Sequence, residues 1–479
     1  MEKENKSGER WKRLKEELEF KKSAVWPELS HPEREEASRF AEEYKEFLNK
    51  AKTEREAVRE LVAMAETNGF VSLDQMTAKG RKLRPGNKVY AVNREKNLAL
   101  IIIGKEPMWR SMNVIGSHID SPRLDLKPMP LYESQGLGLL KTHYYGGIKK
   151  YHWLSYPLAM HGLVVKQNGE KVDIRIGDKE NDPVFVITDL LPHLAKEQLK
   201  KKLGEAVSGE ALNILAGTLP LEEKEAPERV KLAILELLKL KYGIIEEDLT
   251  SAELELVPAT PARDIGFDRS LVGAYGQDDR ICAYTSLRAV LECSNPARTA
   301  VALFVDKEET GSTGNTGMRS RFFENTIAEL LYFVTGDYDE IYCRKALANG
   351  RALSADVSAA VDPTWEDVHD KYNAARVGYG IVMTKYTGSG GKYSTSEAGA
   401  EFVADIRKVF NENKIIWQTG ELGKVDQGGG GTIAQFMARY GMDVLDCGPA
   451  VLSMHSPVEI AHKGDIYMSF KAYRAFLNS

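Results

Sequence analysis

Apolar, strand-length segments that end in polar residues constrain the fold of this chain more than any other feature. Four such segments, separated by helical patterns such as those of residues 279–291 and 323–334, are found at residues 112–120, 299–312, 352–363 and 442–457. A continuous apolar run is typical of a strand buried on both faces, and its alternation with helices predicts an α/β domain with a mixed sheet. Ligands of such sheets bind beyond the carboxyl ends of the strands, so the polar endings are candidates for a functional site.

The N-terminal region is predicted to be helical over residues 1–70. Its last helix has apolar residues at i, i+3, i+4 and i+7 and a stop at Asn68-Gly69. These apolar residues are Val58, Leu61, Val62 and Ala65. The charged segment before this helix fits either an exposed helix or a partner-binding arm, and the pattern favours a solvated face. Next, KVYAV and NLALIIIG flank the turn NREK, which predicts a β-hairpin near residues 88–104.

A different pattern occupies residues 122–259. A β-rich sequence with Gly-Gly turns comes first, followed by the amphipathic pattern APERVKLAILELLKLKYGIIEEDL and by the prolines Pro258 and Pro261. We interpret this stretch as a second domain that is inserted into the α/β domain. The predicted organisation is therefore one domain in two pieces, residues 1–121 and 260–479, around an insert of residues 122–259.

Composition and charge exclude several classes of protein. The chain has 479 residues, a net charge of −5 and a pI near 6.1, and phosphate recognition needs a concentrated positive field. Its four cysteines contain no C-x-x-C pair and are too few for a disulfide framework. The charged N-terminus lacks the apolar region of a signal peptide, and no apolar run approaches the ~20 residues that span a bilayer. We therefore expect a cytoplasmic protein that uses neither a membrane nor nucleic acid.

The polar endings contain two imidazoles and several carboxylates. They are His118 in SHIDSPRL, Asp278-Asp279 in GQDDRICAY, Glu308-Glu309 in DKEETGS, Asp356 in SADVSAAVD and His455 in MHSPVE. Each alone has an ordinary explanation, such as a structural histidine, a solvated pair of glutamates or an aspartate in a turn. Together they follow apolar runs, where an acid is costly unless a cation compensates its charge. Two imidazoles and three carboxylates suit two divalent ions that share a bridging carboxylate, with zinc, cobalt or manganese as the metal.

Two further acids fit the same chemistry. Glu308 directly precedes the candidate ligand Glu309, and a glutamate in this position can act as base towards a water whose pKa the ions have lowered. Asp120 follows His118 by two residues and is placed to orient the ligand imidazole.

The five motifs SHIDSP, GQDDRICAY, DKEETGS, SAD and MHSP, in this order, resemble those of the M18 metallo-aminopeptidases, the family of aspartyl aminopeptidase and yeast vacuolar aminopeptidase I. The resemblance spans nearly the whole chain. It implies a co-catalytic two-metal zinc exopeptidase whose mixed-sheet α/β peptidase domain is interrupted by a smaller β-rich dimerisation domain. It also implies a tetrahedral homododecamer that is built from dimers and encloses its active sites.

The resemblance further implies a role for each matching residue. Asp278 would be the bridging ligand, and its choice over Asp279 follows the family's Asp-Asn dipeptide, whose first member binds metal. One metal site would be completed by His118 and Asp356, and the other by Glu309 and His455. Glu308 would be the general base and acid, and Asp120 would lie behind His118.

Two loops also match the family. The segment Leu191-Pro192-His193-Leu194-Ala195 resembles one whose histidine reaches a neighbouring subunit's active site and steadies the tetrahedral intermediate, which makes His193 a candidate catalytic donor. A surface histidine at a helix start explains the residue equally well. The glycine run 428–431, followed by Thr432, resembles the family's active-site Gly-Thr loop and otherwise indicates a flexible turn.

One position departs from the family pattern. Acid-specific members carry a lysine in the substrate pocket, on the strand after the SAD motif, where this chain has Thr384. Lys385 follows, but adjacent strand residues point to opposite faces, so it does not simply substitute. A neutral or broad N-terminal preference is therefore expected.

We therefore predict an aminopeptidase that releases neutral or assorted N-terminal residues from peptides with two divalent ions, most simply zinc. Another two-metal amide hydrolase, such as a carboxypeptidase or an N-acyl amino acid deacylase, is the alternative enzyme. A third hypothesis is a non-catalytic oligomeric shell or cargo protein, and the complete ligand set with Glu308 argues against it.

Overall fold

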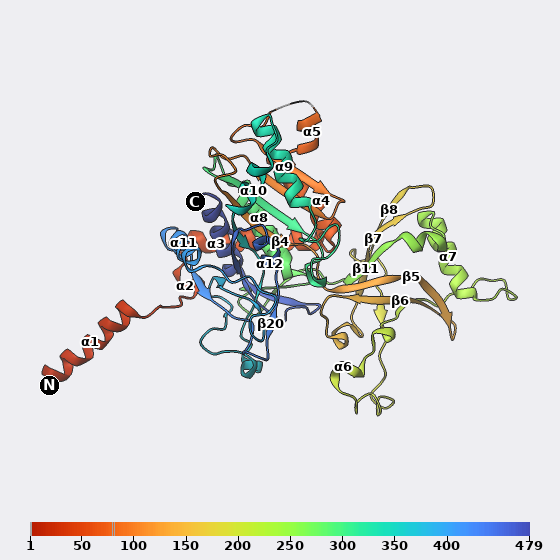
Figure 1. Cartoon of the computed structure of the whole chain (residues 1–479). Helices are drawn as coiled ribbons and strands as arrows, with labels where there is room; N and C mark the ends of the chain where they lie inside the picture. Colours follow the sequence, from red (N-terminus) through yellow and green to blue (C-terminus); the bar gives the residue numbers. More distant parts are fainter. Residues whose placement is uncertain (1, 79, 81) are drawn as a thin grey trace.

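The centre of the fold is a nine-stranded mixed sheet, which we describe from a computed structural model of residues 2–78, 80 and 82–479 (Figure 1). In spatial order its strands are β1 (Val71–Ser72), β2 (Lys88–Asn93), β3 (Asn97–Ile102), β14 (Thr299–Val305), β4 (Met112–His118), β15 (Arg351–Ser354), β21 (Asp443–Gly448), β17 (Ile381–Thr384) and β19 (Trp417–Thr419). Strands β14, β4, β15 and β21 run parallel at its middle. Each of the four apolar segments contributes one of them, which confirms the predicted α/β class.

Helices cover both faces of this sheet. One face packs against α3 (His31–Lys50), α4 (Glu54–Thr67), α8 (Gln277–Leu291), α11 (Ala400–Glu412) and α13 (Lys463–Leu477), together with the short helix α2 (Val25–Glu28). The other face packs against α9 (Phe322–Thr335), α10 (Glu340–Ala348), α12 (Ala434–Ala438) and the short α5 (Leu73–Ala78). Among the described residues, no helix is both long enough and apolar enough to cross a membrane.

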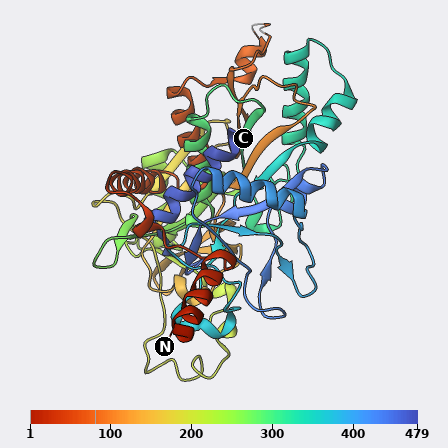
Figure 2. The ribbon, with the colours of Figure 1, turned by 90° about the vertical axis from the view of Figure 1, so that its left-hand side faces the viewer.

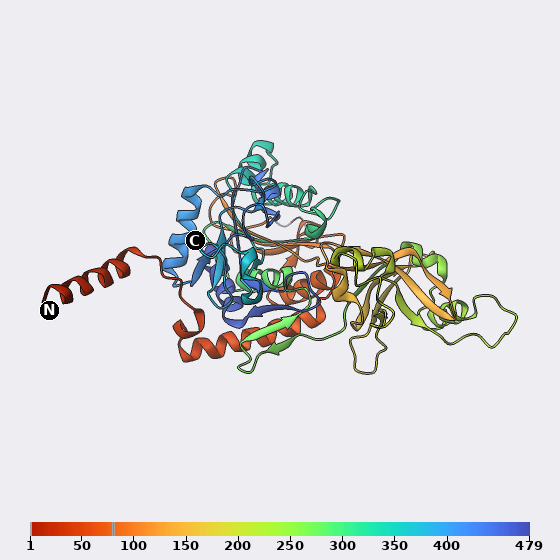
Figure 3. The same ribbon diagram turned by 90° about the horizontal axis from the view of Figure 1, so that it is seen from below.

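The N-terminal helices and the hairpin lie where the sequence predicts them. Helix α4 begins at a capping box, in which the backbone N–H of Glu56 donates to the Thr53 hydroxyl, and it ends just before Asn68. Strands β2 and β3 pair antiparallel from Lys88–Ile102 to Asn93–Asn97. Helix α1 (Glu2–Leu18) extends away from the body, as Figures 1 and 3 show, and Figure 2 views the molecule from its side. The chain that follows it is held by Phe20, whose ring stacks on Trp417.

A second body lies on the side opposite α1 (Figures 1 and 3). It is a seven-stranded antiparallel sheet in the order β8 (Lys171–Ile176), β7 (Leu158–Val165), β11 (Glu253–Pro258), β5 (Arg123–Ser134), β6 (Leu137–Tyr145), β10 (Ile214–Gly217) and β9 (Val186–Ile187). Helix α7 (Arg229–Tyr242) packs on the sheet and the two share a separate apolar core, while the short α6 (Leu203–Ala206) lies in an outer loop. These elements all belong to the stretch that the sequence predicts to be an insert.

Two small sheets complete the larger body. One has five strands in the order β12 (Arg263–Ile265), β13 (Leu271–Ala274), β23 (Glu459–His462), β22 (Ala450–Leu452) and β16 (Ser358–Ala359). In the other, β18 (Gly388–Ser389) pairs with β20 (Gly429–Gly430), which lies in the glycine run. The loop between β22 and β23 carries His455, so the five-stranded sheet brings this histidine to the edge of the main sheet.

The two bodies are joined by ion pairs around His161, a fully buried residue of β7. Its Nδ1 lies 2.8 Å from Glu56 of α4, and its Nε2 lies 3.3 Å from Asp178 of the second body. Lys52 of the larger body contacts Asp178 of the second body at 2.9 Å. Arg175, also of the second body, pairs with the same aspartate. The junction is therefore a network in which each body supplies both charges.

We expect His161→Gln to lower the melting temperature by at least about 3 °C near pH 6, because breaking a buried pair costs several kcal/mol. Burial lowers the pKa of His161, but hydrogen bonds with Asp178 and Glu56 outweigh it and hold that pKa above its ordinary value. The stabilisation is therefore complete below the ordinary histidine pKa and is lost as the pH rises through the folded value. Calorimetry at about pH 6 and about pH 9 measures the difference, with the exposed His143→Gln as control. Equal effects at both pH values would contradict the charged pair.

Candidate functional site

Four of the predicted site residues lie at the carboxyl ends of the parallel strands. His118 is the last residue of β4, Glu308 and Glu309 form a short 3-10 turn after β14, and Asp356 lies two residues beyond β15. The register places these ends together, because Val305 pairs with His118 and Ser354 pairs with Gly116. Polar groups from separate parts of the sequence therefore meet at one edge of the sheet.

Asp278 lies between the two imidazoles. Its Oδ1 is 3.1 Å from Nε2 of His118, and its Oδ2 is 3.1 Å from Nε2 of His455. Each ring donates from Nδ1 to a backbone carbonyl, His118 to Asp120 at 3.0 Å and His455 to Gly147 at 2.9 Å. A histidine held in this way presents a free Nε2 lone pair, which is the arrangement that metal-ligating histidines use.

Two further carboxylates flank this trio. Glu309 Oε1 lies 3.4 Å from His455 Nε2, and Asp356 Oδ1 lies 3.9 Å from His118 Nε2. Three overlapping groups of possible ligands result: Asp278 with Glu309 and His455, Asp356 with His118 and Asp279, and His118 with Glu308 and Glu309. Each has the nitrogen and oxygen donors of a zinc site.

The electrostatics of these acids fits bound cations. Burial, with the negative charge of Asp278 next in importance, raises the pKa of Glu309 well above its ordinary value. Burial and the nearby Asp279 do the same to the pKa of Asp356. Glu309 Oε1 is also buried without a hydrogen-bond partner in the part of the chain that the structure describes. Divalent ions would remove this electrostatic penalty, so the residues present fit a metal centre.

Asp279 lies closer to the site than the sequence indicates. Its Oδ2 accepts the backbone N–H of His118 at 3.3 Å, and its side chain is fully buried. The adjacent Asp278 is the residue that faces both imidazoles, which is consistent with the predicted choice between the two. Asp279 supports the strand end that carries His118.

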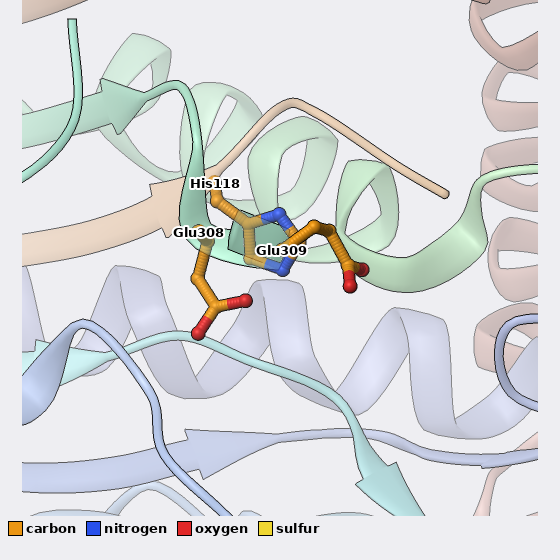
Figure 4. A group of neighbouring side chains, drawn as sticks. All are labelled: His118, Glu308 and Glu309. Carbon is orange, nitrogen blue, oxygen red and sulfur yellow. The ribbon is translucent and has the colours of Figure 1, made fainter. Parts of the chain in front are cut away.

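Glu308 lines a cavity of about 210 Å³ together with the candidate ligands. Burial, the largest effect on this carboxyl group, raises the pKa of Glu308 to about 7. In Figure 4 its side chain and that of Glu309 point in different directions near the ring of His118. Both carboxyl groups lie near His118, but Glu309 also belongs to the group with Asp278 and His455, whereas Glu308 does not.

Asp120 connects the site to the second body. Its Oδ1 lies 3.3 Å from Nδ1 of His118 and accepts the backbone N–H of Glu308, while its Oδ2 accepts that of Glu309. The hydroxyl of Tyr145, at the end of β6, donates to Oδ2 at 2.7 Å. Asp120 thus fixes the turn that carries both glutamates as well as the imidazole. Sequence reasoning missed Tyr145, which lies in the insert and outside all five motifs.

Glu459 is a second supporting acid that sequence reasoning missed. Its Oε2 accepts the backbone N–H of Asp278 at 3.0 Å, and its Oε1 accepts that of His455 at 2.7 Å. It therefore ties together the two segments that enter the site from outside the main sheet. The only sequence signal is its place four residues after His455, at the end of MHSPVE.

The remaining predicted residues separate into two groups. Thr384 and Thr432 line the site cavity with three residues of the glycine run, and Thr432 donates to the buried Asp446 at 2.6 Å. Lys385 is absent from the lining, as the alternation of strand side chains predicts. His193 lies on an exposed loop of the second body and lines no part of this cavity. Its predicted role therefore depends on another copy of the chain.

Comparison with known proteins matches this chain to one family of metallopeptidases. A family model described as aminopeptidase I zinc metalloprotease (M18) matches residues 47–477. The M18 family aminopeptidase 1 of Clostridium acetobutylicum is 52% identical over 455 residues, which are 95% of this chain and 98% of that protein.

Solved structures of aminopeptidases have the same fold as this chain. The crystal structure of an M18 family aminopeptidase from Thermotoga maritima has a TM-score of 0.91 and 49% identity, and the match covers 96% of this chain and all (100%) of that one. A structure from S. cerevisiae, described as the mApe1 dodecamer, shares the fold at a TM-score of 0.72 and 22% identity, over 93% of this chain and 97% of that one.

We expect Tyr145→Phe to weaken Zn²⁺ binding by about tenfold, because groups that orient a ligand histidine typically contribute this much to metal affinity. The change removes the hydroxyl that donates to Asp120 and leaves the ring in place. Titration calorimetry of the metal-free protein measures the affinity. Tyr144→Phe, at the exposed neighbouring position, is the matched control. Equal affinities in the two variants would contradict a positioning role for Tyr145.

Proposed function

The chain belongs to the M18 family of zinc aminopeptidases, and we propose that it releases N-terminal residues from short peptides with two divalent ions and Glu308 as general base. The observation that carries the proposal is the position of Asp278 between two imidazoles that both present Nε2. One carboxylate with an oxygen towards each ring is suited to bridging two ions.

The ligand assignment follows from the same contacts. Asp278 is the shared ligand, with His118 and Asp356 on one side and Glu309 and His455 on the other. When bound, the ions supply Lewis acidity that polarises the scissile carbonyl and lowers the pKa of water. Zinc is the first choice, because the family model describes a zinc metalloprotease. Cobalt and manganese suit the same nitrogen and oxygen donors.

Glu308 is the group that moves the proton. It lines the cavity beside the ligands, and burial raises its pKa to about 7, which is close to the value that a general base needs at neutral pH. It takes a proton from the attacking water and gives it to the leaving amine. The backbone N–H of Glu308 donates to Asp120, so the base is held by the same group that orients His118.

The cavity favours a neutral N-terminal side chain. Asp446 is nearly fully buried and lines it together with Thr384 and Leu422. Burial raises the pKa of Asp446 to about 6, so above that pH the cavity presents a negative charge. A substrate carboxylate would be repelled there, whereas a neutral side chain is not. This supports the neutral or broad preference that Thr384 indicates.

We expect Glu308→Gln to lower kcat by about 10²–10⁴-fold while the zinc content stays that of the wild type, because the change removes a proton carrier and no ligand. His455→Ala, in contrast, should lose zinc. Steady-state kinetics with leucine p-nitroanilide and elemental analysis of the purified proteins measure both effects. Normal turnover by Glu308→Gln would overturn the mechanism.

We expect leucine p-nitroanilide to exceed glutamate p-nitroanilide in kcat/KM by at least about tenfold at about pH 8, because Asp446 repels an acidic side chain. N-acetyl-leucine p-nitroanilide should not be cleaved, since its amino group is blocked. Initial rates with the three substrates test both points. Cleavage of only the blocked substrate would favour a deacylase, and a preference for glutamate would contradict the role of Asp446.

The assembly is a homododecamer built from dimers of the second body. The exposed loop that carries His193 is lined by Leu190, Leu191 and Leu194, which are 53%, 50% and 68% exposed. Apolar side chains at this density on one loop support its burial against a second copy. In such a dimer His193 reaches the neighbouring site and donates to the tetrahedral intermediate. The dodecamer of the S. cerevisiae relative supports the larger assembly.

Multi-angle light scattering should give a mass of about twelve times the 53.5 kDa of one chain. Leu194→Glu should release smaller species, because a charge at the contact between copies is not compensated. A monomeric wild type would contradict the assembly and would leave His193 without a site to serve.

A further inference from the structure

A second cavity of about 760 Å³ adjoins the site cavity. The two share His455, Met454 and Ala359, so they meet at one of the candidate metal ligands. The second cavity is walled by the segment of the insert that follows β6, residues 147–156, and by loops of the larger body that include Trp365. It is formed only where the two bodies meet.

The two cavities differ in charge, because the site cavity is strongly acidic while the second contains one lysine and one acid. The site cavity is lined by five carboxylates, whereas the second cavity is lined by Lys149, His152 and His369 and by a single acid, Asp362. The carboxylate of Asp362 accepts the backbone N–H of Thr364 at 2.8 Å, which partly neutralises it. A peptide across both cavities would therefore have its ammonium group in the acidic cavity and its carboxylate beside Lys149.

Two imidazoles of the second cavity lack partners. Nδ1 of His152 and Nδ1 of His369 are buried without a hydrogen bond to any described residue, and His369 is only 9% exposed. Buried polar groups are normally satisfied, so these two nitrogen atoms in the cavity wall are exceptions to the usual pattern. Trp365 and Tyr151 add aromatic surface at the same walls. The cavity is thus built from groups that suit a peptide backbone and its terminal carboxylate.

The position of Lys149 sets the length of peptide that fits. The carbonyl of Gly147 accepts from the ring of His455, which marks the end of the site cavity. The backbone of Lys149 lies two residues further along the chain, at most about 7 Å from that of Gly147. Two extended residues of a substrate cover the same distance. A carboxylate one or two residues beyond the cleaved bond is therefore within reach of the Lys149 ammonium group, which is exposed in the described structure.

We propose that the second cavity binds the part of the peptide that follows the cleaved bond, and that Lys149 recognises the free terminal carboxylate of dipeptides and tripeptides. This rests on the proposed function and adds a substrate class to it. The enzyme favours short peptides with a free carboxylate over blocked or long ones. The carboxylates of the site cavity and Lys149 in the second cavity fix the direction in which the peptide lies.

The test compares Leu-Gly-Gly with Leu-Gly-Gly-amide, which differ only in the terminal charge. For the wild type we expect kcat/KM for the acid to exceed that for the amide by about tenfold, mainly through KM, because a charge-assisted contact is lost in the amide. Lys149→Gln should bring the ratio close to one. Lys150→Gln, the adjacent lysine outside the cavity lining, should keep the wild-type ratio.

Each other outcome is decisive. Hydrolysis of both peptides at equal rates by the wild type would overturn the inference but leave the aminopeptidase intact. A ratio that Lys149→Gln does not change would also overturn it. A lower mass of Lys149→Gln in light scattering, with the ratio unchanged, would instead make the cavity a contact between copies of the chain. Failure to cleave either peptide would overturn the proposed function itself.

Discussion

The burial of several carboxylates at the ends of parallel strands is the constraint on which the rest of the structure depends. Each charge taken out of water costs several kcal/mol unless a cation or hydrogen-bond donors compensate it. The chain places two imidazoles against Asp278 and directs backbone N–H groups at Asp120 and Glu459. Glu309 Oε1 and Asp279 Oδ1 still lack a hydrogen-bond partner among the described residues. These acids therefore carry an electrostatic penalty that either protonation or bound cations would relieve.

The second body takes part in this site. Tyr145 donates to Asp120, and the carbonyl of Gly147 accepts from His455, so the end of β6 and the segment that follows it contact the support of both candidate ligand histidines. The ion pairs around His161 then hold the whole insert against α4. A rotation of the insert would disturb both imidazoles, and the geometry of the site depends on the junction between the bodies.

The sequence predicted the sheet and the candidate ligands because both follow from local patterns. The ends of parallel strands converge, so acids and imidazoles after the apolar runs had to meet, as the pairing of Val305 with His118 shows. Tyr145 and Glu459 could not be predicted in this way. Their contacts join segments that are 25 and 181 residues apart, and neither follows an apolar run that ends at the main sheet. The second cavity was missed for the same reason, since its walls come from both bodies.

The net charge of −5 describes the chain poorly, because its negative charge is concentrated. Asp278, Glu309 and Asp356 would face two divalent ions, so the charge left at the metals is small. The carboxylates that remain free in the site cavity, Glu308 and Asp446, then dominate its field. A peptide ammonium is attracted to them while a side-chain carboxylate is repelled, and both effects come from the same two groups. If the chain acts as proposed, this cavity would recognise the free N-terminus and disfavour acidic residues by one electrostatic means, without a separate device for either.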